Sequence, residues 1–230
     1  MSHSSQGSFF YARSWDYFRE VGILSVFLLL ASCATIKVER SYKNPEVVLF
    51  HANRVLVGLN ERDPQRFDLY EIDLVSGERN LVFENPRFAN VVVDRMYRPR
   101  LVYEQIPGGS ARYLKLDGEG NVTPFIDIAA EDVNSTRVIG FNVAGTHFYM
   151  VDTRQRNTAA LVSVDFSTGS QEVLGFDPAA DVADVLLNPA TYVPEAYSIN
   201  RLRSQWHPIG AAVASDLQRI DETLAGDFQI

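Results

Sequence analysis

Short apolar runs separated by turn-forming residues recur along the chain from residue 45 onward. Val55–Leu59, Leu69–Leu74 and Leu81–Phe83 are rich in β-branched, leucine and aromatic residues, with Asn, Asp, Pro and Gly between them. Runs of this length and composition predict short β-strands connected by tight turns. We therefore expect an all-β region over residues 45–207.

One pattern returns three times at a nearly constant interval. Asp73, Asp117 and Asp165 each end an apolar strand and precede a glycine-containing turn, and they lie 44 and 48 residues apart. A degenerate fourth copy is expected at Pro194–Asn200, with Trp206 on the returning strand. In the three clear copies the aspartate is preceded by a further, matching strand. These strands are Arg54–Asn60, Pro99–Glu104 and His147–Asp152.

The interval and the strand content together favour a β-propeller. Units of ~40–50 residues with several strands each are typical of propeller blades. The sequence therefore predicts a partial β-propeller of three to four antiparallel blades. Asp can accept hydrogen bonds from nearby backbone amides and Gly can adopt positive φ, so together they close a hairpin. We expect Asp73, Asp117 and Asp165 to be such turn residues rather than a calcium site, whose oxygen ligands must converge.

Near the end of the chain the apolar pattern changes to helical spacing. Polar residues such as Asp216, Arg219 and Glu222 lie between the apolar ones. This arrangement predicts an amphipathic helix within residues 208–230, and its apolar side must bury against another element. The apolar positions are Ala211, Val213, Ala214, Leu217, Ile220 and Leu224.

An uncharged apolar run precedes the β region. Val21–Ser32 contains twelve such residues, which is short for a membrane-spanning helix and typical of the core of a signal peptide. The motif Leu-Ala-Ser-Cys that ends at Cys33 resembles the lipobox of bacterial lipoproteins, in which the cysteine receives the lipid. This resemblance implies a leader over residues 1–32, lipid attachment at Cys33 and a tether over residues 33–44. The alternative is a short buried helix with an unmodified cysteine.

Composition and charge exclude several classes of protein. The chain has 21 Lys and Arg against 29 Asp and Glu, a formal net charge of −8, and it lacks a run of basic residues. Because nucleic-acid binding needs a clustered basic face, we expect no nucleic-acid partner. Cys33 is the only cysteine of the sequence, which excludes an internal disulfide framework and a cysteine-rich metal site.

The sequence contains no recognisable catalytic constellation. A serine hydrolase of the α/β type needs a G-x-S-x-G turn, and the chain lacks one; Ser110 and Ser170 follow glycines in predicted hairpin loops. Gly118–Gly120 is likewise a turn and not a phosphate-binding loop. The histidines are not at the spacing of zinc ligands, so we expect no catalytic residue, no metal and no cofactor. These histidines are His3, His51, His147 and His207.

Two groups of carboxylates occur in predicted loops. Glu61, Asp63 and Asp68 lie in one loop beside arginines, and Glu131 lies next to Asp132 in another. Paired acids can perform acid–base chemistry when burial raises the pKa of one of them. In loops of this composition we interpret them as solvated charges and turn caps.

Several segments resemble the N-terminal propeller of prolyl-oligopeptidase-type serine peptidases. The likeness is carried by Gly58–Pro64, Phe67–Tyr70 and Ile72–Glu78, and it continues through Val138–Phe141 to Trp206-His207. It implies a propeller that covers an α/β-hydrolase domain and filters access to a Ser, an Asp and a His. The helix near residues 211–225 is similar to the passage towards that catalytic domain. Propellers of the family usually have seven or eight blades, so only the later part of one is implied here.

These observations leave three hypotheses for function. The chain is a non-catalytic propeller segment that gates or positions peptide substrates for a catalytic domain absent from it, or a stand-alone envelope lipoprotein whose blades bind a peptide or protein partner. The third is an enzyme that uses residues without a recognisable pattern. An incomplete ring leaves open sheet faces, so self-association is expected. If the leader directs export, the resemblance implies a lipid-anchored protein at a membrane surface, on the periplasmic side of a bacterial envelope. If the leader does not direct export, we expect a cytoplasmic protein.

Overall fold

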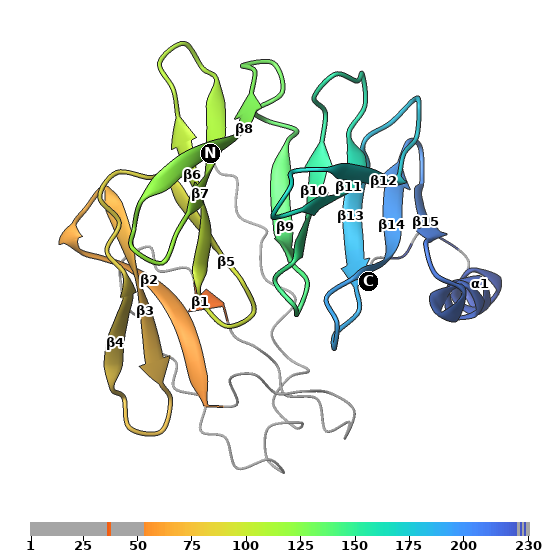
Figure 1. The fold of residues 1–230 in the computed structure, drawn as a ribbon. Helices are drawn as coiled ribbons and strands as arrows, with labels where there is room; N and C mark the ends of the chain where they lie inside the picture. Colours follow the sequence, from red (N-terminus) through yellow and green to blue (C-terminus); the bar gives the residue numbers. More distant parts are fainter. Residues whose placement is uncertain (1–35, 38–52, 225, 227, 229–230) are drawn as a thin grey trace, which may run out of the picture. The chain divides into compact units, whose positions relative to one another are not determined.

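A computed structural model of the chain describes residues 36–37, 53–224, 226 and 228 (Figure 1). The described strands and helix belong to one compact unit, Cys33–Ile230. The predicted leader over residues 1–32, the predicted lipid attachment at Cys33 and all of the tether except residues 36–37 lie outside the described residues.

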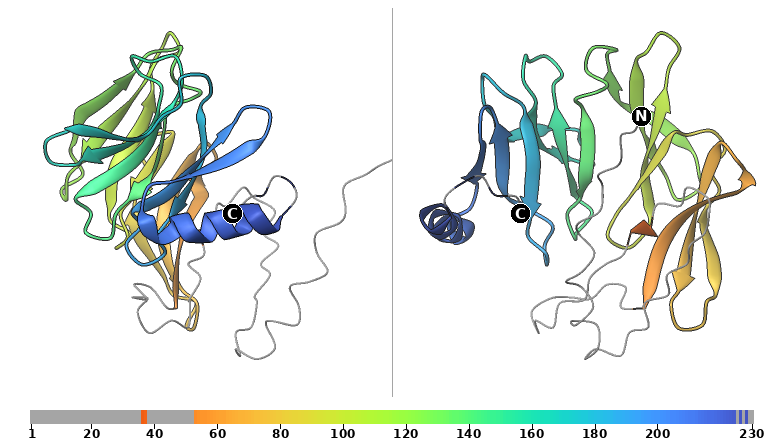
Figure 2. Two further views of the ribbon diagram at one scale, coloured as in Figure 1. Left: turned by 90° about the vertical axis from the view of Figure 1, so that its right-hand side faces the viewer. Right: turned by 180° about the vertical axis from the view of Figure 1, so that it is seen from behind.

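The described strands form four antiparallel sheets, and in each sheet the strands lie side by side in chain order (Figures 1 and 2). The first sheet contains β1 (Ile36–Lys37), β2 (Arg54–Asp63), β3 (Arg66–Asp73) and β4 (Arg79–Phe83). The second contains β5 (Asn90–Val93), β6 (Pro99–Gln105), β7 (Ala111–Leu116) and β8 (Val122–Ile128). The third contains β9 (Arg137–Phe141), β10 (His147–Asp152), β11 (Ala160–Asp165) and β12 (Gln171–Gly175). The last contains β13 (Val182–Leu187), β14 (Pro194–Asn200) and β15 (Ser204–Pro208).

This arrangement confirms the predicted partial propeller of three to four antiparallel blades. The repeated strands of the sequence are the second strand of each sheet, β2, β6, β10 and β14, and Trp206 lies on β15 as expected. The first strands of the later sheets, β5, β9 and β13, were not predicted. Their side chains are mostly half-buried, so their sequences lack the strong apolar contrast of a core strand.

Neighbouring sheets pack face to face through three hydrophobic clusters. Phe83 of the first sheet packs against a cluster that contains Val102 and Leu114 of the second. Between the second and third sheets the cluster is larger and contains Tyr113 and Phe148. Side chains of the third and last sheets form the remaining cluster, which comprises Tyr149, Val151, Ala159, Leu161, Val182 and Ile199. Burying an apolar side chain of this kind stabilises the fold by about 1.5–3 kcal/mol. These interfaces therefore hold the sheets together.

The three repeated aspartates close the hairpins between the two outer strands of their sheets, as predicted. Oδ1 of Asp73 accepts hydrogen bonds from the amides of Val75 and Ser76, both at 2.8 Å. Asp117 and Asp165 accept equivalent bonds in the β7–β8 and β11–β12 turns. A glycine at positive φ follows in each turn, at positions 77, 120 and 169. Hydrogen bonds from the side chain of Ser167 and the amide of Thr168 hold the pKa of Asp165 well below its ordinary value.

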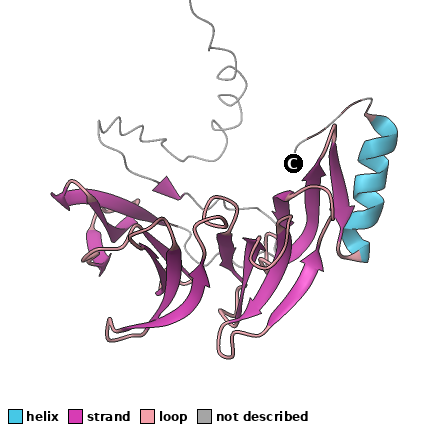
Figure 3. Cartoon of the chain, turned by 90° about the horizontal axis from the view of Figure 1, so that it is seen from above, coloured by secondary structure: helices cyan, strands magenta, loops and turns pink. Residues whose placement is uncertain are grey.

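The predicted C-terminal helix is α1 (Ala211–Thr223), and it packs alongside β15 (Figure 3). Leu217 is its buried residue, and Val213 and Ile220 are half-buried. The predicted apolar stripe is shorter than expected, because Ala211 and Leu224 at its two ends are exposed. No helix within the described residues is long and apolar enough to cross a membrane.

Candidate functional site

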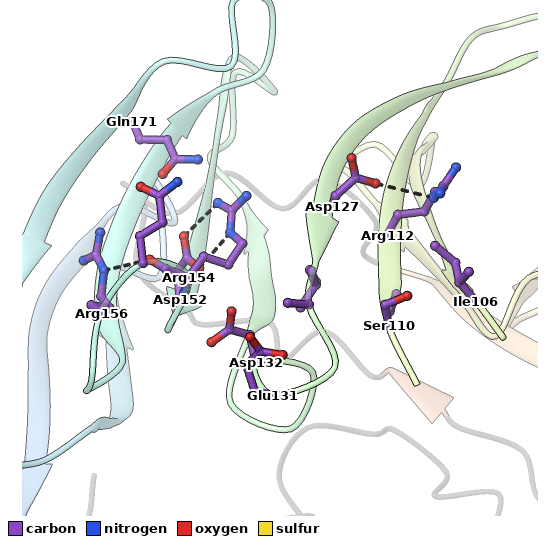
Figure 4. Close-up of a pocket in the computed structure, with 14 residues that line it drawn as sticks. Ile106, Ser110, Arg112, Asp127, Glu131, Asp132, Asp152, Arg154, Arg156 and Gln171 are labelled. Carbon is purple, nitrogen blue, oxygen red and sulfur yellow. Dashed lines mark hydrogen bonds and ion pairs between the residues drawn. The ribbon is translucent and has the colours of Figure 1, made fainter. Parts of the chain in front are cut away.

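A polar cavity of about 740 Å³ lies between the second and third sheets, at the end of the sheets where the β6–β7, β8–β9 and β10–β11 loops meet (Figure 4). We call it the inter-sheet groove. It combines side chains from residues 106–112, 127–132 and 152–156 with Gln171 of β12. Side chains as far apart in the sequence as Ile106 and Gln171 therefore share one cavity.

The second sheet contributes a cross-strand pair of opposite charge. Arg112 on β7 lies directly opposite Asp127 on β8, and the Nε–Oδ1 distance is 3.5 Å. Ser110, at the end of the Gly108-Gly109-Ser110 turn, and Ile128 complete this side. Each positive group here has a negative neighbour, so the second-sheet side is close to electrically neutral.

The third sheet contributes a tightly held arginine. Nε and Nη2 of Arg154 donate to the two carboxylate oxygens of Asp152 at 2.9 and 2.8 Å, and the amide of Arg154 donates to the same carboxylate at 3.0 Å. Asp152 is only 1% exposed. Bidentate pairs of this kind are strong and directional, so the Arg154 guanidinium is fixed in place. The turn that follows holds Gln155 at a φ of 61°.

The β8–β9 loop supplies two carboxylates to the lining of the groove. Glu131 is exposed and Asp132 is half-buried, and neither carboxylate makes a hydrogen bond or ion pair within the part of the chain that the structure describes. The loop is joined to the β10–β11 loop by Thr136 and Thr153, whose hydroxyl oxygens are 2.9 Å apart. The amide of Thr153 also donates to the Thr136 hydroxyl at 3.2 Å. The two loops therefore form one connected rim.

The structure brings together some of the residues that the sequence singled out. Glu131, Asp132 and Ser110 all line the inter-sheet groove. The described histidines do not: His147 Nε2 lies 3.7 Å from Asp165, and the ring of His207 stacks on Tyr197 at 5.2 Å. The described residues contain no group of three or more His, Cys, Asp or Glu side chains that could hold a metal ion.

One interpretation of the carboxylates was wrong. Asp68 is not solvated: its side chain is 2% exposed and accepts two hydrogen bonds from Arg62, at 2.8 and 2.9 Å, and one from the amide of Asn85. These bonds, with the Arg62 side chain first, lower the pKa of Asp68. Glu61 pairs with Arg79, and Asp63 caps the amide of Gln65, as expected of solvated charges and turn caps.

Sequence reasoning did not identify Asp152, Arg154, Arg156 or Gln171 as site residues. They come from a different repeat than Arg112 and Asp127, and no motif links them along the chain. The Asp152–Arg154 spacing of two was the available signal, since an arginine just beyond a strand can pair with an aspartate at its end. Such a spacing is common in turns and does not by itself indicate a site.

Comparison with known proteins finds sequence similarity to peptidases. No family model matches the chain. Dipeptidyl aminopeptidase BIII of Pseudoxanthomonas mexicana is 35% identical over 181 residues, which is 78% of this chain and 26% of that protein. Dipeptidyl peptidase family member 6 of Caenorhabditis elegans is 26% identical over 144 residues, 59% of this chain and 20% of that protein.

Among solved structures, TolB from Acinetobacter baumannii superimposes with a TM-score of 0.48 and 15% identity, over 70% of this chain and 40% of TolB. The chain spans about a quarter of the length of the first curated relative and a fifth of the second. The chain is thus a homologue of the dipeptidyl peptidases, and its similarity to the N-terminal propeller of prolyl-oligopeptidase-type serine peptidases is confirmed.

Proposed function

We propose that these residues are a substrate-handling part of a peptidase: they gate or position peptides for an α/β-hydrolase catalytic domain that is not among the 230 residues. The observation that carries the proposal is the inter-sheet groove, in a chain 35% identical to a dipeptidyl aminopeptidase over most of its length. A cavity of this size, lined by hydrogen-bonding groups from several loops, suits a short polar ligand such as a peptide.

The residues of this chain support a role in peptide binding rather than in peptide cleavage. The sequence has no G-x-S-x-G turn to expose a nucleophilic serine. Ser110 lines the groove, but both described histidines have partners elsewhere, on Asp165 and Tyr197. A serine without a base within hydrogen-bonding reach is a weak nucleophile. Because neither described histidine contacts Ser110, the proposal assigns peptide cleavage to groups from another domain.

The test is to isolate the native gene product from its own cells and treat it with a fluorophosphonate that labels activated serines. We expect a product larger than 25.8 kDa by the mass of a further domain, with the label on a serine outside residues 1–230. The purified 230-residue chain is the control and should remain unlabelled. A native product of 25.8 kDa or less, without label, would contradict the proposal.

A second candidate function is a stand-alone lipoprotein that binds a peptide or protein partner. The observation that favours it is the lipobox-like motif ending at Cys33, after the apolar run Val21–Ser32. The same mass measurement separates the two functions. A lipoprotein would lose residues 1–32, gain the mass of a lipid on Cys33 and partition into the membrane fraction.

A further inference from the structure

The charges that line the inter-sheet groove fall into a paired set and an unpaired set. Arg112 pairs with Asp127, and Arg154 pairs with Asp152. In each case both partners come from the same repeat, so each pair is close to neutral, although the Arg112 Nε makes no hydrogen bond. The other charged residues of the groove therefore determine which ligand charges it favours.

The unpaired set has charges of both signs in separate places. Glu131 and Asp132 lie on the β8–β9 loop, and Arg156 lies on the far side of Arg154, on the third-sheet side of the groove (Figure 4). The Arg156 Nε donates to the carbonyl oxygen of Arg154 at 3.4 Å. Within the described residues, none of the three forms an ion pair. A groove with negative charge on one loop and positive charge on another is complementary to a ligand that carries both charges.

The groove is preorganised for binding. The hydroxyl bridge between Thr136 and Thr153 connects the loop of Glu131 and Asp132 to the loop of Arg156. The bidentate Asp152–Arg154 pair fixes the strand end from which that second loop departs. A ligand therefore does not have to order these loops, and the entropic cost of binding is reduced.

We propose that the inter-sheet groove recognises a peptide segment with a basic side chain and a neighbouring acidic side chain. The basic group lies between the carboxylates of Glu131 and Asp132, and the acidic group pairs with Arg156. Gln171 and Ser110 add hydrogen-bonding side chains to the lining of the groove, Ser110 from the second-sheet side (Figure 4). This inference rests on the proposed function only in taking the ligand to be a peptide.

The proposal is tested by calorimetric titration of the 230-residue chain with the blocked peptide acetyl-Gly-Lys-Gly-Asp-Gly-amide. Blocked ends ensure that a terminal ammonium or carboxylate cannot replace the side chains. Replacing Lys by norleucine should weaken binding about tenfold, the effect of losing a charge-assisted pair. The double variant Glu131→Gln/Asp132→Asn should lose a similar factor for the Lys peptide and nothing further for the norleucine peptide.

Arg156→Gln should weaken binding of the Asp peptide about threefold, since one partly solvated pair contributes less than the two carboxylates together, and should not affect a peptide with Asn in its place. Glu172→Gln is the matched control, because Glu172 is exposed on β12 and does not line the groove. The chain's thermal unfolding curve confirms that each variant is folded.

Equal binding of the Lys and norleucine peptides, or unchanged binding by the Glu131→Gln/Asp132→Asn variant, would overturn the inference. So would binding that requires a free amino terminus, because the carboxylates would then recognise the end of a peptide rather than a side chain. The titration uses no catalytic readout. Its failure is therefore distinct from failure of the proposed function, which the mass and labelling experiment decides.

Discussion

The third sheet and the first sheet have the same antiparallel strand order but different surroundings. Along β10 the side chains alternate between two clusters: Phe148 and Met150 pack with the second sheet, and Tyr149 and Val151 with the last. All four are at most 4% exposed. On β4 of the first sheet no side chain is buried, and Leu81 is 53% exposed. The contrast follows the place of each strand within its own sheet: β2 of the first sheet buries Val55, Leu56 and Val57, whereas β12 of the third sheet is mostly exposed, like β4.

The largest expected effect comes from emptying the interface of the second and third sheets. Phe148 is fully buried, and its ring lies 5.4 Å from Phe141 and 6.0 Å from Phe125. Phe148→Ala should lower the free energy of unfolding by about 3–5 kcal/mol through lost burial and the cavity left behind. Leu81→Ala is the control from the first sheet and should cost less than about 1 kcal/mol. Urea unfolding of both variants measures the contrast, and equal losses would contradict it.

A smaller effect is expected where the third sheet meets the last. A Cβ at Gly175 would lie 2.4 to 2.7 Å from ring atoms of Tyr197, which itself stacks on His207. Gly175→Ala should therefore displace Tyr197 and destabilise the fold by about 1–3 kcal/mol, as overpacking does. Gly118→Ala is the control, since a Cβ there meets nothing within 4 Å. If Gly175→Ala leaves the free energy of unfolding unchanged, the interface of the third and last sheets accommodates added volume, and the expected destabilisation is wrong.

In the first sheet, Asp68 should make the free energy of unfolding depend on pH. The pKa of Asp68 is lowered in the folded chain by the Arg62 side chain, so its ionised form stabilises folding above the ordinary value of 3.8. That contribution should decline as the pH falls through 3.8 towards the lower pKa of the folded state. Asp68→Asn should flatten the decline, measured as unfolding free energy between pH 6 and about pH 3. A variant with an unchanged slope would contradict this role for Asp68.

The smallest global effect is expected at α1. Leu217 is its buried side chain, and the helix packs mainly on β15. Leu217→Ala should detach the helix locally and leave the clusters between sheets intact. Hydrogen exchange should become faster in residues 211–223 and stay unchanged in β10. Faster exchange in β10 would mean that α1 supports the sheets more broadly.

Local chemistry made much of this fold predictable. The Asp73, Asp117 and Asp165 turns were predicted because each depends on residues within a few positions of the aspartate. Strands such as β10 were predicted because burial on both faces leaves a continuous apolar run. β5 and β9 were missed because half-buried strands lack that contrast.

The site was less predictable, for a physical reason. Glu131 and Asp132 were noticed as a pair, but the groove arises from packing of the second sheet on the third, which brings Arg112 and Arg156 to one cavity. The burial of Asp68 depends on Arg62 and on the amide of Asn85, 17 residues away. Neighbours of this kind follow from tertiary structure and leave no spacing to recognise.

The chain-order pairing of strands also bears on how the protein forms during synthesis. Each sheet pairs only strands that are consecutive in the chain, and each cluster joins only consecutive sheets. An emerging chain can thus complete one sheet and dock the next on it before later residues leave the ribosome, as domains that fold N-terminal first do. Because such contacts are close in sequence, little loop-closure entropy opposes each step. The third sheet would then wait, with one face exposed, until residues 182–208 arrive to cover it.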